Sequence, residues 1–168
     1  MASEILVVDD EEDIRDLICG ILTDEGYEAR MAGDSDGALS AIRARRPQLV
    51  ILDIWLQGSR LDGIHILDHV KREHPELPVV MISGHGTVET AVASIKKGAY
   101  DFIEKPFKAD RLLNVVERAL EAARLRREVQ ELKLKAGDDG EMIGQSSGIA
   151  QLRSLIEKIA PTNSRVLI

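Results

Sequence analysis

The sequence predicts an α/β fold, a doubly wound five-stranded parallel sheet with helices on both faces. Over the first 107 residues, five short apolar runs alternate with longer segments in which apolar residues recur with the period of a helix. The apolar runs are short and uninterrupted, which is typical of strands buried on both faces. With 44% hydrophobic and 30% charged residues, the 168-residue chain has enough apolar side chains to form a core.

Each strand and helix is expected from its local pattern. Strands are expected near Ile5–Val8, Glu28–Met31, Leu49–Leu52, Val79–Ile82 and Asp101–Ile103, of which the second is the weakest. The first helix has the apolar stripe Ile14, Leu17, Ile18, Ile21 and Leu22 and ends at Gly26. Further helices are expected near Ser35–Arg46, Gly63–Glu73 and Thr87–Lys97, and from Ala109 onward.

The last helix extends beyond the domain that it closes. Leu113, Val116 and Leu120 are expected to face the sheet. Past Glu121 the apolar residues Ala122, Leu125, Val129 and Leu132 form either a short heptad seam or a solvated extension with scattered leucines. The glycines and aspartates of residues 137–140 indicate a linker. We therefore expect a domain over residues 1–121, a linker helix and linker over residues 122–141, and the opening piece of another domain over residues 142–168.

The acidic charge lies in the first of these regions. Residues 1–121 hold 14 Lys/Arg and 23 Asp/Glu, a net charge of −9, whereas residues 122–168 hold 8 and 6. An acidic domain is repelled by nucleic-acid phosphates, so direct contact with DNA is not expected. No apolar stretch of the chain is long enough to cross a bilayer, and its single cysteine, Cys19, cannot form an internal disulfide. We therefore expect a cytoplasmic protein.

Polar side chains follow four of the five predicted strands. Asp9 and Asp10 follow the first strand, Asp53 the third, Ser83 the fourth and Lys105 the fifth. Because the C-terminal ends of parallel strands meet at one edge of a sheet, these side chains are expected to share a crevice. Three carboxylates repel one another unless a cation lies among them, and oxygen ligands favour Mg²⁺. A carboxylate beside Mg²⁺ and an ammonium can accept a phosphoryl group, and Asp53 is the best-placed nucleophile.

Simpler explanations exist for each of these residues taken alone. Acidic residues are favoured at helix N-termini and serine is favoured in turns. Their combination at one edge of the sheet favours a functional site. A zinc site is the weaker alternative, because His65 and His69 lie one helical turn apart but no third ligand is placed to join them.

Four motifs carry a resemblance to a known family: Val8-Asp9-Asp10, Leu52-Asp53, Ile82-Ser83-Gly84 and Glu104-Lys105-Pro106-Phe107. With these motifs, residues 4–121 resemble the receiver domain of bacterial two-component response regulators, a flavodoxin-like fold with strand order 2-1-3-4-5. The resemblance implies the following roles: Asp53 as phosphoacceptor, Asp9, Asp10, Asp53 and the backbone carbonyl of Trp55 as Mg²⁺ ligands, Ser83 and Lys105 as phosphoryl-binding residues, and Ser83 and Phe102 as switch residues. It also implies a cis peptide bond between Lys105 and Pro106.

The end of the chain carries a second resemblance. Residues 142–146 and 159–168 are similar to the start of the AAA+ ATPase module of sigma-54-dependent activators of the NtrC family. The Gly-rich phosphate-binding loop that follows in that family is absent, so no nucleotide site is expected in this chain. The run from Asp53 to Gly63 is longer than the common receiver pattern and has Gln57 where proline is usual. This lengthened loop resembles that of the nitrogen-related members of the family.

The resemblance implies a two-component response regulator. Such a protein takes a phosphoryl group from a sensor histidine kinase, changes its homodimer packing and controls an AAA+ transcription-activation module. One alternative is a haloacid-dehalogenase-like phosphatase, which also uses an aspartate nucleophile and Mg²⁺. That family needs Asp-x-Asp after its first strand, where this chain has Asp9-Asp10-Glu11. A third class is an interaction module that works without phosphorylation, against which the full set of site residues argues.

Overall fold

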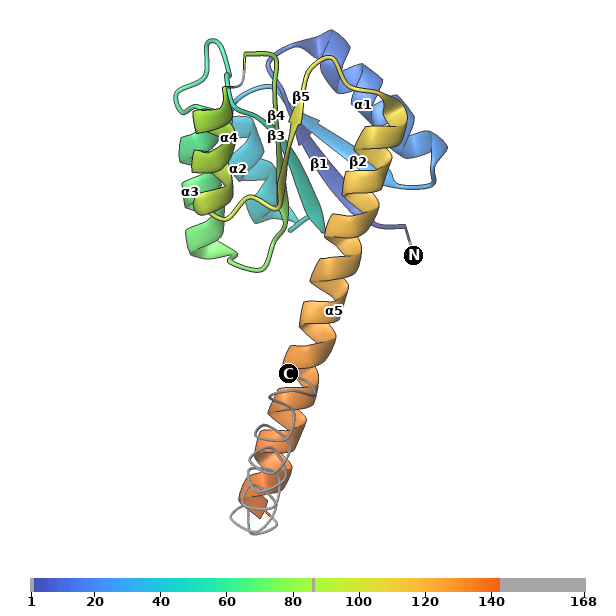
Figure 1. The fold of residues 1–168 in the computed structure, drawn as a ribbon, viewed down its shortest axis with the longest axis vertical. Helices are drawn as coiled ribbons and strands as arrows, with labels where there is room; N and C mark the ends of the chain where they lie inside the picture. The colour runs from blue at the N-terminus through green and yellow to red at the C-terminus, as the bar shows by residue number, and fades with distance from the viewer. Residues whose placement is uncertain (1, 86, 143–168) are drawn as a thin grey trace, which may run out of the picture. The chain divides into compact units, whose positions relative to one another are not determined.

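The computed structural model describes residues 2–85 and 87–142, and its centre is a five-stranded parallel sheet (Figure 1). The strands are β1 (Glu4–Val8), β2 (Glu28–Ala32), β3 (Leu49–Asp53), β4 (Val79–Ser83) and β5 (Asp101–Glu104). Their order is β2-β1-β3-β4-β5, and all four neighbouring pairs are parallel. This confirms the predicted fold and strand order. The order reverses between β1 and β3, which is where an open α/β sheet forms its binding crevice.

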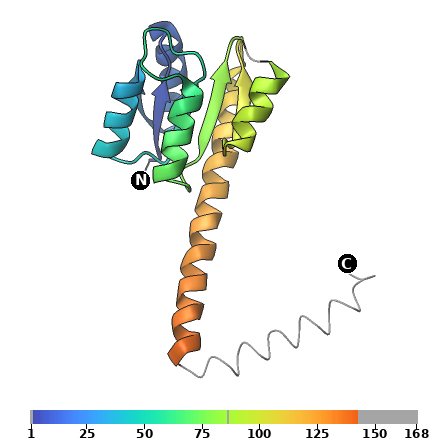
Figure 2. The ribbon, with the colours of Figure 1, turned by 90° about the vertical axis from the view of Figure 1, so that its left-hand side faces the viewer.

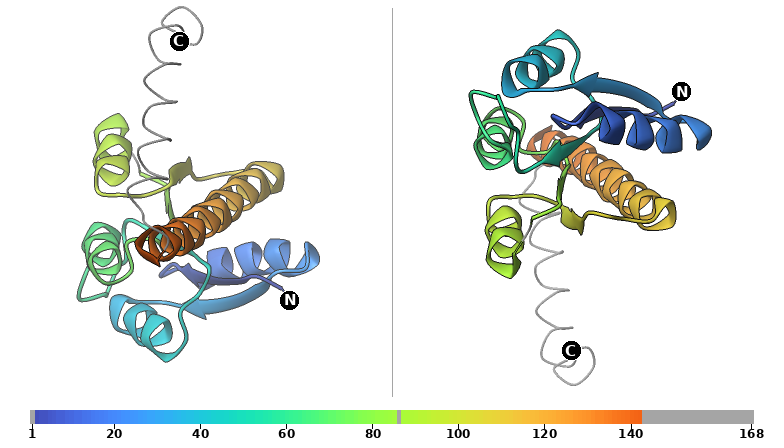
Figure 3. Two further views of the ribbon diagram at one scale, coloured as in Figure 1. Left: turned by 90° about the horizontal axis from the view of Figure 1, so that it is seen from below. Right: turned by 90° about the horizontal axis from the view of Figure 1, so that it is seen from above.

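In the described residues, five helices accompany the sheet. They are α1 (Glu12–Asp24), α2 (Ser35–Ala44), α3 (Gly63–Glu73), α4 (Val88–Lys96) and α5 (Ala109–Met142). Views from below and above show α1 and the start of α5 on one face of the sheet and α2, α3 and α4 on the other (Figure 3), and the side view separates the latter three helices (Figure 2). Alternate strand residues supply the two cores, because successive side chains of a strand point to opposite faces. Ile5 and Val7 belong to the core beneath α1 and α5, whereas Leu6 and Val8 belong to the core beneath α2 and α3.

The observed apolar stripes of α1 and α5 overlap with the predicted ones but are not identical to them. In α1 only Ile18 and Leu22 are fully buried, and Leu17 is 51% exposed. In α5 the fully buried side chains are Leu112, Val115, Val116 and Ala119, whereas the predicted Leu113 and Leu120 are only partly buried. Both α5 sets have helical spacing, so periodicity alone does not select between them. The choice is made by how the helix rotates when it packs on the sheet.

The helix α5 continues to Met142, through residues 137–140, which the sequence predicts as a linker. The segment predicted as a linker is therefore helical in the structure. Once a helix has formed, each further residue adds a hydrogen bond, and a glycine costs only about 1 kcal/mol relative to alanine.

The chain divides into two units after Arg124, close to the boundary expected at residue 121. The predicted AAA+ segment begins at Met142, and its residues 143–168 lie outside the described residues. In the described part of the chain, no helix combines the length and apolar character that a bilayer span needs.

Candidate functional site

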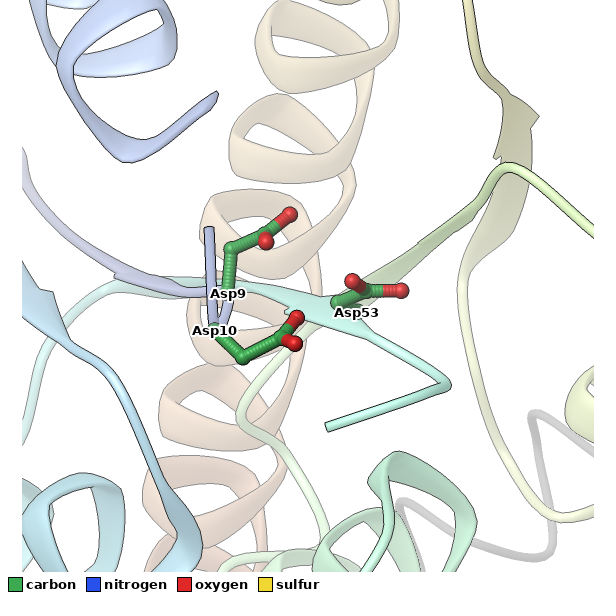
Figure 4. A group of neighbouring side chains, drawn as sticks. All are labelled: Asp9, Asp10 and Asp53. Atoms are coloured by element: carbon green, nitrogen blue, oxygen red, sulfur yellow. The ribbon is translucent and has the colours of Figure 1, made fainter. Parts of the chain in front are cut away.

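Three aspartates meet at the C-terminal edge of the sheet. Asp9 and Asp10 follow β1, and Asp53 is the last residue of β3. Each offers a carboxylate oxygen, and these oxygens lie within 4.8 Å of one another (Figure 4). Asp9 and Asp53 are buried, at 0% and 3% exposure. Within residues 2–85 and 87–142 this is the single group of three or more metal-ligating side chains, so the histidine-based zinc alternative has no support there.

Lys105 joins two of these aspartates. It lies just beyond β5, where its backbone N–H donates to the carbonyl of Ser83 at 2.9 Å and its peptide bond to Pro106 is cis, as predicted. Its Nζ donates to Oδ2 of Asp9 at 2.9 Å and to Oδ2 of Asp53 at 3.1 Å. The carboxylate of Glu11 lies 3.7 Å from the same nitrogen. Lys105 thus partly neutralises an otherwise acidic crevice.

The protonation of Asp53 reflects these surroundings. Burial, followed by the negative charge of Asp9, raises the pKa of Asp53 to about 6, although the charge and hydrogen bond of Lys105 act in the opposite direction. Burial by itself would lower the pKa of Lys105, but its contacts with Asp9 and Asp53 together raise it. The net result is a carboxylate that is costly to ionise without a further cation, and this fits a metal site.

Ser83 ends β4 and Phe102 lies on β5, and neither side chain contacts the aspartates in the contacts described. Ser83 is fully buried at the end of β4, and its Oγ accepts a hydrogen bond from the backbone N–H of His85 at 3.1 Å. Phe102 is partly buried on β5 and packs against the core beneath α2 and α3. The site residues that the sequence predicts after β1, β3, β4 and β5 are thus brought to one edge of the sheet, while Phe102 lies further back in the sheet, opposite Met81.

The loop after β3 supplies two backbone groups to the site. The N–H of Trp55 donates to Oδ1 of Asp53 at 3.3 Å, and the N–H of Gln57 donates to Oδ2 of Asp10 at 3.2 Å. A third N–H, that of Glu11, donates to Oδ1 of Asp9 at 2.8 Å. None of these three N–H contacts was predicted from the sequence. For Gln57 the signal was present, since it stands where proline, which lacks an N–H, is usual.

A small pocket of about 80 Å³ opens between these groups, with Asp10, Asp53, Trp55, His85 and Lys105 in its lining. This volume accommodates an ion with a few waters, because a water occupies about 30 Å³ in the liquid. Mg²⁺ prefers one or two carboxylates together with several waters. The residues present therefore fit Mg²⁺ by ligand type, by charge and by space.

Comparisons with known proteins agree with this arrangement. A family model described as the response regulator receiver domain matches residues 5–117. The nitrogen assimilation regulatory protein NtrX of Azorhizobium caulinodans is 66% identical over 168 residues, which cover 100% of this chain and 37% of that protein. The crystal structure of Brucella abortus NtrX in complex with ADP matches with a TM-score of 0.77 and 64% identity, covering 97% of this chain and 35% of that one.

The chain is also similar to a solved structure that consists of a receiver domain without further domains. The beryllofluoride-activated receiver domain dimer of NtrC4 matches with a TM-score of 0.68 and 40% identity, covering 71% of this chain and 98% of that one. The chain spans 37% of the length of the Azorhizobium relative, so that relative contains much more than the part compared. Because the family model matches well over half of the residues, the chain belongs to the response regulator receiver domain family, and it is similar to nitrogen regulators of the NtrX type.

Proposed function

We propose that Asp53 is the phosphoacceptor of this receiver domain and that Asp9, Asp10 and Asp53, with the backbone carbonyl of Trp55, hold Mg²⁺. One observation carries the proposal: the buried Asp53 lies in a cluster of three carboxylates and is contacted by the ammonium of Lys105. A nucleophile, acidic metal ligands and a fixed cation are the parts that phosphoryl transfer requires.

The chemistry follows from these positions. A carboxylate oxygen of Asp53 forms a bond to the phosphorus of a phosphohistidine, and the phosphorus–nitrogen bond breaks with its electron pair left on the imidazole. Mg²⁺, when bound, supplies positive charge to the phosphoryl oxygens. Lys105 supplies an ammonium to the same oxygens, and the hydroxyl of Ser83, which accepts from His85, can donate to them.

The switch and the partners belong to the same proposal. The phosphodonor is a sensor histidine kinase of the NtrY type, and the phosphorylated domain changes its homodimer packing to control an AAA+ transcription-activation module. Support comes from the similarity to NtrX regulators and from the NtrC4 receiver, whose activated form is a dimer. Ser83 and Phe102 are the proposed switch residues, because Phe102 is partly buried beside the strand that Ser83 ends.

We also propose a cytoplasmic location, because the chain has a single cysteine and its proposed phosphodonor is a kinase that spends ATP inside the cell. This part of the chain is not proposed to contact DNA, since residues 1–121 are strongly acidic. The family match gives no support to the phosphatase alternative.

Phosphorylation by a small phosphodonor tests the proposal. Phosphoramidate with Mg²⁺ is expected to add one phosphoryl group, measured by intact mass, and the product should be labile to hydroxylamine as an acyl phosphate is. Asp53→Asn should abolish it, whereas Asp36→Asn, at an exposed aspartate on α2, should not. Phosphate that persists in Asp53→Asn would overturn the assignment. Turnover of free phosphate esters would favour a phosphatase.

A further inference from the structure

The loop between β3 and α3 contains a tight turn that faces the metal ligands. The N–H of Ser59 donates to the carbonyl of Leu56 at 3.3 Å, and Gly58 has a φ of +75° while no other residue type in the described part of the chain has a positive φ. A four-residue turn with a positive φ at its third residue is of type II. Gln57 is then its second residue, the position at which proline is favoured.

Gln57 differs from proline in one respect that matters here. A proline at this position has no N–H, whereas the N–H of Gln57 donates to Oδ2 of Asp10 at 3.2 Å across 47 residues of sequence. Among the three aspartates, Asp9 is contacted by Glu11 and Lys105, and Asp53 by Trp55 and Lys105. Asp10 is more exposed than either, and the loop provides its contact.

Two serines, Ser35 and Ser59, fix this turn to the start of α2. Ser59 Oγ accepts from the backbone N–H of Ser35 at 2.8 Å and donates to the carbonyl of Leu61 at 2.8 Å. Ser35 Oγ accepts from the N–H of Leu61 at 3.2 Å, and Ser35 is fully buried. Breaking these bonds would leave buried polar groups without partners, which is costly, so the serine pair holds the turn in place.

We propose that Gln57 is a positioning residue for the metal site, acting through its backbone N–H, and that Ser35 and Ser59 hold it in position. The inference rests on the proposed Mg²⁺ site. The N–H orients the carboxylate of Asp10 and offsets part of its negative charge while three carboxylates are close together. Hydrogen bonds to ligating carboxylates commonly change metal affinity by about 10- to 100-fold.

Paired substitutions at Gln57 separate the N–H from the side chain. Gln57→Pro suits the second position of a type II turn but removes the N–H, and is expected to weaken Mg²⁺ binding roughly 10-fold. Gln57→Ala keeps the N–H and should bind Mg²⁺ far more tightly than Gln57→Pro. The measurement is a titration with MgCl₂ followed by the fluorescence of Trp55, the single tryptophan, which lies beside the site. Equal affinities for the two variants would overturn the proposal.

A second set of variants tests the serine pair while leaving Gln57 unchanged. Ser59→Ala should weaken Mg²⁺ binding and Ser59→Thr, which keeps a hydroxyl, should restore it. Arg60→Ala is the matched control on the same loop, because its ion pair with Asp36 is exposed and is expected to leave Mg²⁺ affinity unchanged. A loss in Arg60→Ala as large as that in Ser59→Ala would contradict a specific role for the serine pair.

Amide exchange without metal makes the test independent of Mg²⁺ binding. In Asp10→Ala the amide of Gln57 should exchange faster than in the wild type, while the amide of Ser59, which donates within the turn, should not. Unchanged exchange at Gln57 would overturn the proposed contact. If Asp10→Ala kept wild-type Mg²⁺ affinity, the proposed metal site itself would fail. If it lost affinity while Gln57→Pro did not, only the positioning role would fail.

Discussion

The ammonium of Lys105 lies 3.1 Å from Oδ2 of Asp53, although 52 residues separate them in the sequence. The contact joins the loop after β5 to the end of β3 and places a fixed positive charge beside the proposed nucleophile. The same nitrogen lies 2.9 Å from Asp9, so a single side chain screens two of the three carboxylates. Its charge would therefore act on both the proposed metal and the proposed phosphoryl group.

Removing Lys105 should separate metal binding from phosphoryl transfer. Lys105→Ala should slow phosphorylation by phosphoramidate by about 100-fold, as the loss of a charge-stabilising donor does. Mg²⁺ affinity should not fall, because the ammonium and the metal share the same carboxylates. Lys108→Ala, at an exposed lysine nearby, serves as the control. Stopped-flow kinetics and a Mg²⁺ titration check the two effects, and lost metal binding in Lys105→Ala would contradict this division of roles.

The raised pKa of Asp53 predicts a pH-dependent stability. In the folded protein this pKa is about 6, above the ordinary value of 3.8, chiefly because the carboxyl group is buried. The folded state therefore holds more protons between these pH values, and the contribution of Asp53 to the free energy of unfolding falls as pH rises from about 4 to about 6. Without Mg²⁺, Asp53→Asn should raise the melting temperature above pH 6 by several degrees.

The advantage of Asp53→Asn should shrink towards pH 4, where the wild-type carboxyl group is protonated in the folded state and the difference in its proton affinity between the folded and unfolded states no longer costs stability. Thermal melts of both proteins across this pH range, in the presence of a chelator, provide the measurement. If the melting temperatures of the wild type and Asp53→Asn differed by the same amount at every pH, the raised pKa of Asp53 would not be the source of the pH-dependent stability.

Gly63 is predicted to be intolerant of a side chain. A Cβ there would lie 2.1 Å from the carbonyl oxygen of Asp53 and 2.7 Å from Cα of Ile54, both backbone atoms. Gly63→Ala should therefore lower the free energy of unfolding by about 2 kcal/mol, as overpacking does, and displace Asp53. Urea denaturation and phosphorylation rates measure the two effects.

Gly20 offers a control for that substitution. It lies within α1, and a Cβ there would meet nothing within 4 Å. Gly20→Ala should raise the free energy of unfolding by up to about 1 kcal/mol, because alanine favours the helix. If the two alanine variants had the same stability, the close approach of α3 to Asp53 would be wrong.

Exposed apolar side chains on α4 predict where the activated domain associates. Val88, Val92 and Ile95 are 79%, 45% and 46% exposed and lie on one side of the helix, at spacings of four and three residues. Beryllofluoride should promote dimer formation, measured by sedimentation, and Val92→Asp should prevent it. Leu132→Asp tests the alternative, the heptad seam, whose Leu125, Val129 and Leu132 are also exposed. A dimer that only Leu132→Asp disrupts would assign association to the seam.

The sequence by itself determined which residues end the strands. Short apolar runs separated by amphipathic segments predict a parallel sheet, and in such a sheet the turns after β1, β3, β4 and β5 share an edge. The sequence alone was therefore enough to predict as neighbours Asp9, Asp10, Asp53, Ser83 and Lys105. This information is local, because the periodicity of side chains along a strand or helix follows from its own backbone geometry.

Only the tertiary structure decided the contacts that depend on how a helix rotates against the sheet or on the conformation of a loop. Whether α5 buries Leu112 or Leu113 depends on how the helix rotates against the sheet, and both choices have the same period. The approach of Gln57 to Asp10 depends on a type II turn fixed by two serines from different elements. Such contacts join residues far apart in the chain, so their geometry is set by packing and not by any local pattern.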